Sequence, residues 1–419
     1  MRTFLRNGFL ALLPMLALLA GSHFSWLLVA RWHGDVLIYA RYAEQVMQGA
    51  LPYRDFTLEY PPLALVPFVL PRLLVLGGEL DAEQYRTLFL LQSALYVWLI
   101  SLVALALAER RRGQVTLWMT VLVAVLSPFL PWRFDLFPAL LTALAVLAAV
   151  RVRAGASGAW LGLGVAAKLY PLVVGPLLGV YVFTAGRAAA PTNTQPVAVW
   201  HPLALLRYCL GGAMALAATV LPFFLLAPVG LLGFLEYHEQ RGLQIESVAG
   251  GAVLLGRLLG LTEASMDFNY GAFHLASPWA DALLPILTPL LIVLYGLLMI
   301  LAWRALRLRT NRLGLGATGG ERVHRLIALV CAALLLFITT SKVFSPQYLV
   351  WLLPFAPLLR PRQIALFAGI CTATVAIFPF GYDALLALER WAVLLLNARN
   401  AATVLLLVWL VMDTVRVAR

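Results

Sequence analysis

The stretch DALLPILTPLLIVLYGLLMILAW, residues 281–303, decides the fold class of this chain. Only its first residue is charged, and about 20 apolar residues are enough to cross the hydrocarbon core of a bilayer as an α-helix. Such a run must be helical, because unpaired backbone groups in lipid are costly. Similar apolar runs occupy residues 9–30, 87–108, 207–228 and 392–413.

The composition of the whole chain agrees with these runs. The 419 residues are 62% hydrophobic and 12% charged, whereas soluble domains are about half apolar and a quarter charged. We therefore predict an all-α polytopic membrane protein, a single domain over residues 1–419, with roughly twelve transmembrane helices by the length rule.

The distribution of charge predicts the sidedness of the chain. The net charge is +12, and the arginines gather in short clusters between apolar runs, for example at residues 110–112, 304–325 and 360–362. This pattern is typical of cytoplasmic loops and does not indicate a nucleic-acid partner. One threading places these clusters and both termini inside. Most acidic residues then lie outside, where residues 31–62 form the first outer loop and residues 236–281 the central one.

An amphipathic helix is expected in the first outer loop, at residues 35–48. One face of this helix would carry Val36, Tyr39, Ala40, Ala43 and Met47. We expect it to lie along the membrane surface.

Residues 159–183 run between two inner loops and must turn back within the membrane. Lys168, Pro171, Gly175 and Pro176 are the expected breakers. Broken helices at membrane depth are tolerated only where they line a cavity.

Asp35 is the first candidate for chemistry. It follows the first span, at a depth where a carboxylate can meet both a lipid phosphate and a polar acceptor. An aspartate at a helix start is more often an N-cap than a catalyst, and the two roles are compatible. Downstream, Arg54 and Asp55 predict a surface ion pair of little energetic weight. Two prolines that follow Glu59 would fix its orientation.

Lysine usage gives two further candidates. Of the 31 Lys and Arg residues only Lys168 and Lys342 are lysines, and both lie in apolar, broken segments. An embedded charge is expensive unless it is paired, which makes a functional role the first hypothesis. Snorkelling to the headgroups is the alternative. Arg133 and Asp135 predict a local ion pair of structural character.

The central outer loop begins EYHEQRGLQIES, residues 236–247. His238 and Glu239 lack the second histidine of the zinc-protease pattern, so we expect no metal site. Arg241 suits a phosphate, because its guanidinium donates two hydrogen bonds at once. The chain has no Walker, dinucleotide-binding or Asp-x-Asp motif. We therefore expect no cofactor, and a donor dissolved in the membrane.

Several motifs occur in an order that resembles a known family: the bacterial polyprenyl-phosphate-sugar-dependent glycosyltransferases of family 87, members of the C superfamily, many of them filed as domain of unknown function 2029. The resemblance spans nearly the whole chain. Its motifs are Gly34-Asp35 with Tyr39, Pro52-Tyr53-Arg54-Asp55, Glu59-Tyr60-Pro61-Pro62, Arg133-Phe134-Asp135-Leu136, Gly164 to Lys168 with Pro171, residues 241–247, and Ser345-Pro346-Gln347-Tyr348 with Trp351 and Pro354.

The resemblance implies an inverting sugar transfer at the outer face of a bacterial inner membrane, in cell-envelope biogenesis. Asp35 would be the general base on the acceptor hydroxyl. The donor would be a polyprenyl-phosphate sugar and the acceptor a glycan or glycolipid, with membrane lipids around the protein. Lys168, Arg241 and Lys342 would offset the charge of the donor phosphate. The implied substrate-binding residues are Tyr39, Arg54, Glu59, Tyr60, His238, Glu246, Gln347 and Tyr348.

The sugar itself stays open. Mannosyltransferases of this family often carry histidines in the late outer motif, where this chain has Pro346-Gln347-Tyr348. Mannose, another hexose or a pentose all remain candidates.

Two other classes of protein fit part of the pattern. A transporter or a flippase for a lipid carrier would also have broken helices with embedded lysines. The absence of an internal repeat, and the concentration of ionisable groups in outer loops, argue against it. A non-catalytic scaffold of an envelope complex is the third reading, and it predicts that Asp35→Asn is silent.

Overall fold

The computed structural model describes residues 2–29, 34–75, 81–108, 111–184, 200–307 and 319–418. Residues 31–33 of the first outer loop, residue 110 of the first arginine cluster and residues 308–318 of the basic loop lie outside the described residues.

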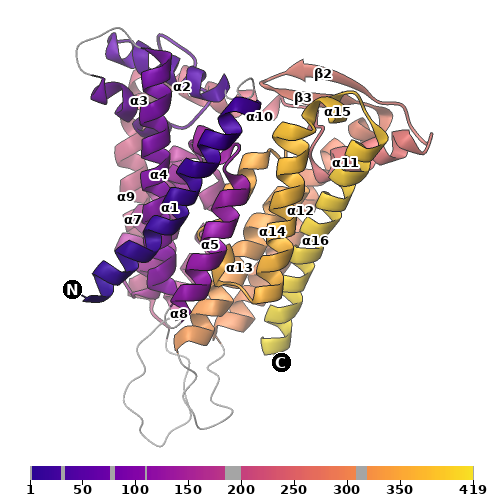
Figure 1. Cartoon of the computed structure of the whole chain (residues 1–419). Helices are drawn as coiled ribbons and strands as arrows, with labels where there is room; N and C mark the ends of the chain where they lie inside the picture. The colour runs from indigo at the N-terminus through magenta and orange to yellow at the C-terminus, as the bar shows by residue number, and fades with distance from the viewer. Residues whose placement is uncertain are drawn as a thin grey trace, which may run out of the picture.

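Long helices pack side by side in a bundle (Figure 1). Among the described residues, seven helices are long and apolar enough to cross a membrane. They are α1 (Arg2–Val29), α4 (Ala82–Leu107), α9 (Pro202–Leu226), α12 (Pro278–Arg307), α13 (Gly319–Thr340), α14 (Pro361–Val375) continued by the π-helix η7 (Ala376–Phe380), and α16 (Arg390–Ala418). The predominantly helical character is confirmed, and the membrane class agrees with these seven helices. The figure of about twelve spans stays a prediction by the length rule.

Shorter apolar helices accompany the long ones. They are α3 (Leu65–Leu74), α5 (Arg112–Leu126), α6 (Leu136–Val150), α7 (Ala154–Ala167), α8 (Gly175–Thr184) and α11 (Val248–Leu258). A helix of about 15 residues rises about 22 Å, less than a hydrocarbon core of about 30 Å. Such a helix is therefore too short to cross the hydrocarbon core by itself.

The predicted break within residues 159–183 is confirmed. Helix α7 ends at Ala167, and Lys168 takes an extended conformation with φ −162° and ψ 144°. A 3-10 turn, η4 (Tyr170–Val173), follows with Pro171 near its start, and α8 begins at Gly175. Proline has no backbone N–H and fits best in the first turn of a helix, so Pro171 favours a restart at this point.

The two ends of the bundle differ in content (Figure 1). Helices α2 (Gly34–Met47), α10 (Pro228–Glu239) and α15 (Tyr382–Leu386) lie with the β-strands at one end, and both termini lie at the other. We call the first the α2 end and the second the terminal end.

Short 3-10 turns connect several of the helices. They are η2 (Pro62–Ala64), η3 (Leu130–Trp132), η5 (Pro346–Leu352) and η6 (Ala356–Leu358).

Arginines bind carbonyl and carboxylate groups at the terminal end. Arg360 Nη1 donates to Asp413 Oδ2 near the end of α16, at 2.9 Å. Arg111 Nη2 donates to the carbonyl oxygen of Leu358 at 3.0 Å, just before Arg360 in the chain. Their grouping with the C-terminus agrees with the predicted threading, in which the arginine clusters and both termini share one side.

A small sheet at the α2 end was not among the predictions. Strand β3 (Ala272–Ala276) lies between β1 (Leu243–Gln244) and β2 (Ser265–Asn269), and both pairings are antiparallel. Tyr270 and Gly271, with φ of 46° and 68°, form the turn between β2 and β3. Positive φ at both central residues is what a two-residue hairpin of this twist requires.

Helix α9 exposes many large apolar side chains on the surface of the protein, whereas a soluble protein buries most of them. Soluble monomers rarely expose contiguous apolar patches of this kind. The exposed side chains include Leu203, Leu206, Leu210, Met214, Leu221, Phe224 and Leu225. The face suits a lipid solvent.

Helices α7 and α9 approach each other through glycines. A Cβ on Gly158 would collide with the carbonyl oxygen of Tyr208, and a Cβ on Gly162 with that of Gly212. Small residues four apart allow this kind of close crossing in membranes. We expect Gly158→Ala to destabilise the protein by about 1–3 kcal/mol, because the added methyl overpacks the contact.

The matched control for this variant is Gly113→Ala in α5, where an added Cβ meets nothing within 4 Å. Alanine is the better helix former there, so this variant should be neutral or slightly stabilising. Thermal unfolding in detergent measures both. Equal midpoints for the two variants would contradict the close crossing.

Candidate functional site

Helix α2 presents one face to the protein interior, as its sequence predicts. Val36, Tyr39, Ala40 and Ala43 are buried, and only Met47, 43% exposed, departs from the predicted face. The ring of Tyr39 stacks on that of Phe68 from α3 with centroids 4.3 Å apart. Aromatic packing of this kind fixes the orientation of the helix that carries Asp35.

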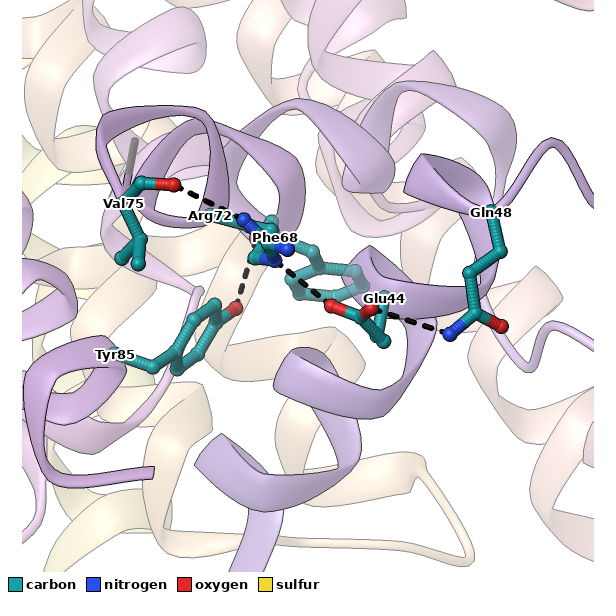
Figure 2. A network of polar contacts seen from close by, with 6 residues as sticks. All are labelled: Glu44, Gln48, Phe68, Arg72, Val75 and Tyr85. Carbon is teal, nitrogen blue, oxygen red and sulfur yellow. Dashed lines mark hydrogen bonds and ion pairs between the residues drawn. The ribbon is translucent and has the colours of Figure 1, made fainter. Parts of the chain in front are cut away.

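Polar contacts fasten the other end of α2 to α3 (Figure 2). Arg72 Nε donates to Glu44 Oε2 at 2.8 Å, and Gln48 Nε2 donates to Glu44 Oε1 at 3.1 Å. The Tyr85 hydroxyl of α4 donates to the Phe68 carbonyl at 2.8 Å. Helices α2, α3 and α4 are therefore tied together, and Asp35 sits in the first turn of a firmly held helix.

Asp35 forms an ion pair with Arg133. The predicted local pair between Arg133 and Asp135 is wrong: Asp135 instead accepts a hydrogen bond from Lys168 Nζ at 2.7 Å. Asp135 is fully buried, whereas the Asp35 side chain is 32% exposed. The physical reason is burial: the inner carboxylate needs an embedded cation, and the break at the end of α7 supplies one.

Aromatic rings enclose the Lys168–Asp135 pair. Trp351 Nε1 donates to Asp135 Oδ1 at 2.6 Å, and Lys168 Nζ lies 4.7 Å from the centre of the Phe134 ring. The Trp351 ring stacks on both Tyr170 and Tyr348 with centroids 4.1 Å apart. The site residue Tyr348 is thus packed against the ring that holds Asp135 in place.

Arg241 stands at the centre of a second group of predicted residues. The pKa of Lys342 is lowered, mainly by burial and further by the positive charge of Arg241. Arg241 also acts on His238. The pKa of His238 is lowered to about 4 by burial and by the positive charges of Arg241, Lys168 and Lys342. His238 is therefore neutral at pH 7. No ion pair joins Arg241 or Lys342 to any carboxylate in the described part of the chain, and Lys342 Nζ donates to the carbonyl oxygen of Glu239 at 2.6 Å.

Glu59 belongs to the same group. Burial raises the pKa of Glu59, opposed by a hydrogen bond from the Tyr237 hydroxyl and by the charge of Arg241. His238 is hydrogen-bonded to the Glu59 backbone. The first outer loop and α10 are therefore joined at the point where the cations gather.

Glu246 is a buried carboxylate that interacts with the charge of Arg133. It is 2% exposed, and burial raises its pKa to about 7 against the opposing charges of Arg399 and Arg133. Gln244 Nε2 donates to Glu246 Oε2 at 3.2 Å. Arg399 was missed in the sequence, although Asn397, Arg399 and Asn400 stand out in the apolar run of α16.

The remaining predicted residues lie at the edges of the cluster. Arg54 forms the predicted surface pair with Asp55, at 2.8 Å, and its side chain is 55% exposed. Tyr60 packs edge-on against Phe134 with centroids 4.8 Å apart, and Gln347 is half-buried at the start of η5. In the described residues no group of three or more His, Cys, Asp or Glu side chains is arranged to hold a metal ion.

Taken together, the α2 end holds the Asp35–Arg133 ion pair and two cations, Arg241 and Lys342, that form no ion pair with a carboxylate among the described residues. Asp35 is partly exposed and held by Arg133, which suits a carboxylate that must reach a substrate. Arg241 and Lys342 repel each other and would gain from binding an anion. Comparison with family models, curated proteins and solved structures found no match to this chain.

Proposed function

We propose that this protein is a membrane glycosyltransferase that moves a sugar from a polyprenyl-phosphate donor to a glycan or glycolipid acceptor at the α2 end. The observation that carries the proposal is the grouping of Asp35 with Arg133, Lys168, Arg241 and Lys342. A carboxylate beside phosphate-binding cations is the minimum equipment for this transfer.

In the proposed reaction Asp35 takes the proton of the acceptor hydroxyl. The acceptor oxygen bonds to the anomeric carbon of the sugar, and the bond from that carbon to the phosphate oxygen breaks. The phosphodiester of the donor carries one negative charge, and the departing polyprenyl phosphate carries about two. Cations that hold the phosphate therefore stabilise the transition state more than the ground state.

Arg241 and Lys342 are the better candidates for the phosphate. Lys168 already bonds a fully buried carboxylate, and its charge is balanced there. Arg241 has a buried Nε without a hydrogen-bond partner in the described chain. A guanidinium presents planar donors to phosphate oxygens. We therefore propose that the donor phosphate binds between Arg241 and Lys342.

The test is transfer by the purified protein in detergent micelles, with a panel of radiolabelled polyprenyl-phosphate sugars and a mixture of envelope glycolipid acceptors. A transferase should form labelled product in micelles, where no membrane separates two compartments. A transporter or flippase can only redistribute its cargo across a vesicle membrane. Movement of a fluorescent lipid carrier in vesicles, with no product in micelles for any donor, would refute the proposal.

A further inference from the structure

Arg399 lies in the middle of α16 and contacts two separate segments of the site. Its Nη2 donates to the carbonyl oxygen of Glu246 at 3.0 Å, and its guanidinium lies 3.9 Å from the centre of the Phe344 ring. Arg399 is 1% exposed. A charge buried in an apolar helix is costly and marks a functional position by default.

Gln244 joins the same two segments from the other side. Its side-chain Oε1 accepts from the Phe344 backbone N–H at 2.8 Å, and its own N–H donates to the carbonyl oxygen of Lys342 at 2.9 Å. Its Nε2 donates to the Glu246 carboxylate. The segments that carry Lys342 and Glu246 are therefore joined through Gln244, and we call this joined unit the scaffold. Arg399 is the cation that contacts it from α16.

The hydrogen-bonding capacity of this scaffold is not filled. Among the described residues, Glu246 Oε1 and the Nε and Nη1 atoms of Arg399 have no hydrogen-bond partner. Buried charges normally have their hydrogen bonds satisfied, and unsatisfied ones call for an explanation. The two charges interact through space, and Arg133 and Tyr382 are the other ionisable groups that interact with Glu246.

Arg133 connects this scaffold to the proposed general base. It pairs with Asp35 and also feels the charges of Asp135 and Glu246. When Glu246 is ionised, its negative charge and that of Asp35 both act on Arg133, and Asp35 is the stronger base. When Glu246 is protonated, Arg133 is left to Asp35 and Asp135.

We propose that Arg399 is a positioning residue for the proposed transfer: from α16 it binds the backbone carbonyl of Glu246 and the Phe344 ring, two positions after Lys342, and its charge balances the Glu246 carboxylate. This inference rests on the proposed function for its link to catalysis, but not for the pairing of Arg399 with Glu246.

The experiment is a pH titration of the full-length protein in detergent, followed by infrared spectroscopy of the carboxyl groups. The Glu246 band is assigned by its loss in Glu246→Gln. In Arg399→Gln the midpoint of this band should move upward by roughly one pH unit, because a nearby positive charge is removed. Arg399→Lys keeps the charge and should titrate like the unaltered protein.

Asn400→Ala is the matched structural control. Asn400 Nδ2 donates to the carbonyl oxygen of Ser247 at 3.1 Å, so its removal also loosens the loop from α16 without changing charge. Its Glu246 midpoint should not move. If Arg399→Gln and Asn400→Ala give the same midpoint, the proposed pairing is overturned.

Transfer rates measured over the same pH range complete the test. The rising limb of the profile near pH 7 should shift with the infrared midpoint in Arg399→Gln and stay in place in Arg399→Lys. A shifted carboxyl band with an unshifted rate profile would remove Arg399 from the positioning role. If the unaltered protein transfers no sugar from any donor, the proposed function fails, while the infrared titration still decides the pairing.

Discussion

Asp35→Asn should lower the rate of sugar transfer by about 100- to 10,000-fold, the range that positioned general bases contribute. Asparagine has nearly the shape of aspartate but cannot accept the acceptor's proton. Donor binding should change little, because the proposed phosphate ligands Arg241 and Lys342 are untouched. The measurement is the initial rate in micelles at saturating donor, with the apparent KM for donor determined alongside.

Asp281→Asn is the matched control for this variant. Asp281, like Asp35, is an acid in the first turn of a helix, and it is exposed. Both variants lose the same favourable interaction of a carboxylate with a helix N-terminus, about 0.3–1 kcal/mol. Asp281→Asn should retain the full rate. A comparable loss in both variants would mean that the effect comes from helix stability.

The ion pair with Arg133 requires a second control. Asp35→Asn leaves Arg133, whose side chain is only 12% exposed, without its contacting carboxylate. If this were the whole effect, adding Arg133→Gln to Asp35→Asn would restore much of the rate. We expect no recovery in the double variant, because the base itself is missing. Full activity in Asp35→Asn would remove Asp35 from the mechanism altogether.

How much of the fold the sequence could predict depends on which interactions are local. Apolar length alone predicts helices such as α12 and α16, and proline predicts the break after Lys168, since both follow from backbone hydrogen bonding in lipid. The sheet was overlooked, although Met266 and Phe268 in β2 and Phe273 and Leu275 in β3 alternate with small or polar residues. Short strands in a polar loop give only a weak signal of this kind.

The exchange of partners around Asp135 could not be predicted from the sequence. Arg133 is two residues away, and a nearby opposite charge is the natural expectation. The actual partners, Lys168 and Trp351, lie 33 and 216 positions further along the chain. Only the packing of the broken α7 segment and of η5 against the start of α6 brings them to Asp135.

The second large effect is expected at this exchanged pair. Asp135→Asn should destabilise the protein by about 3–5 kcal/mol, the cost of leaving one partner of a buried ion pair uncompensated. The amide oxygen can still accept from Trp351, so the loss reports mainly on the unpaired Lys168. Lys168→Met should cost a similar amount, because it leaves Asp135 charged and fully buried. Both are measured as the free energy of unfolding in detergent.

Each single variant leaves one buried charge without its partner. The double variant Asp135→Asn with Lys168→Met should therefore lose far less stability than the sum of the two single losses. The exposed Arg54–Asp55 pair is the matched control, and Asp55→Asn should leave the free energy of unfolding nearly unchanged, because exposed ion pairs contribute little. The alternative is the role that the family resemblance implies for Lys168. If Lys168→Met left stability unchanged and raised the KM for donor instead, Lys168 would be a ligand of the donor phosphate, and its contact with Asp135 would be a resting state of the empty site. Stability and donor affinity, measured on the same variant, therefore separate a lysine that builds the site from one that binds within it.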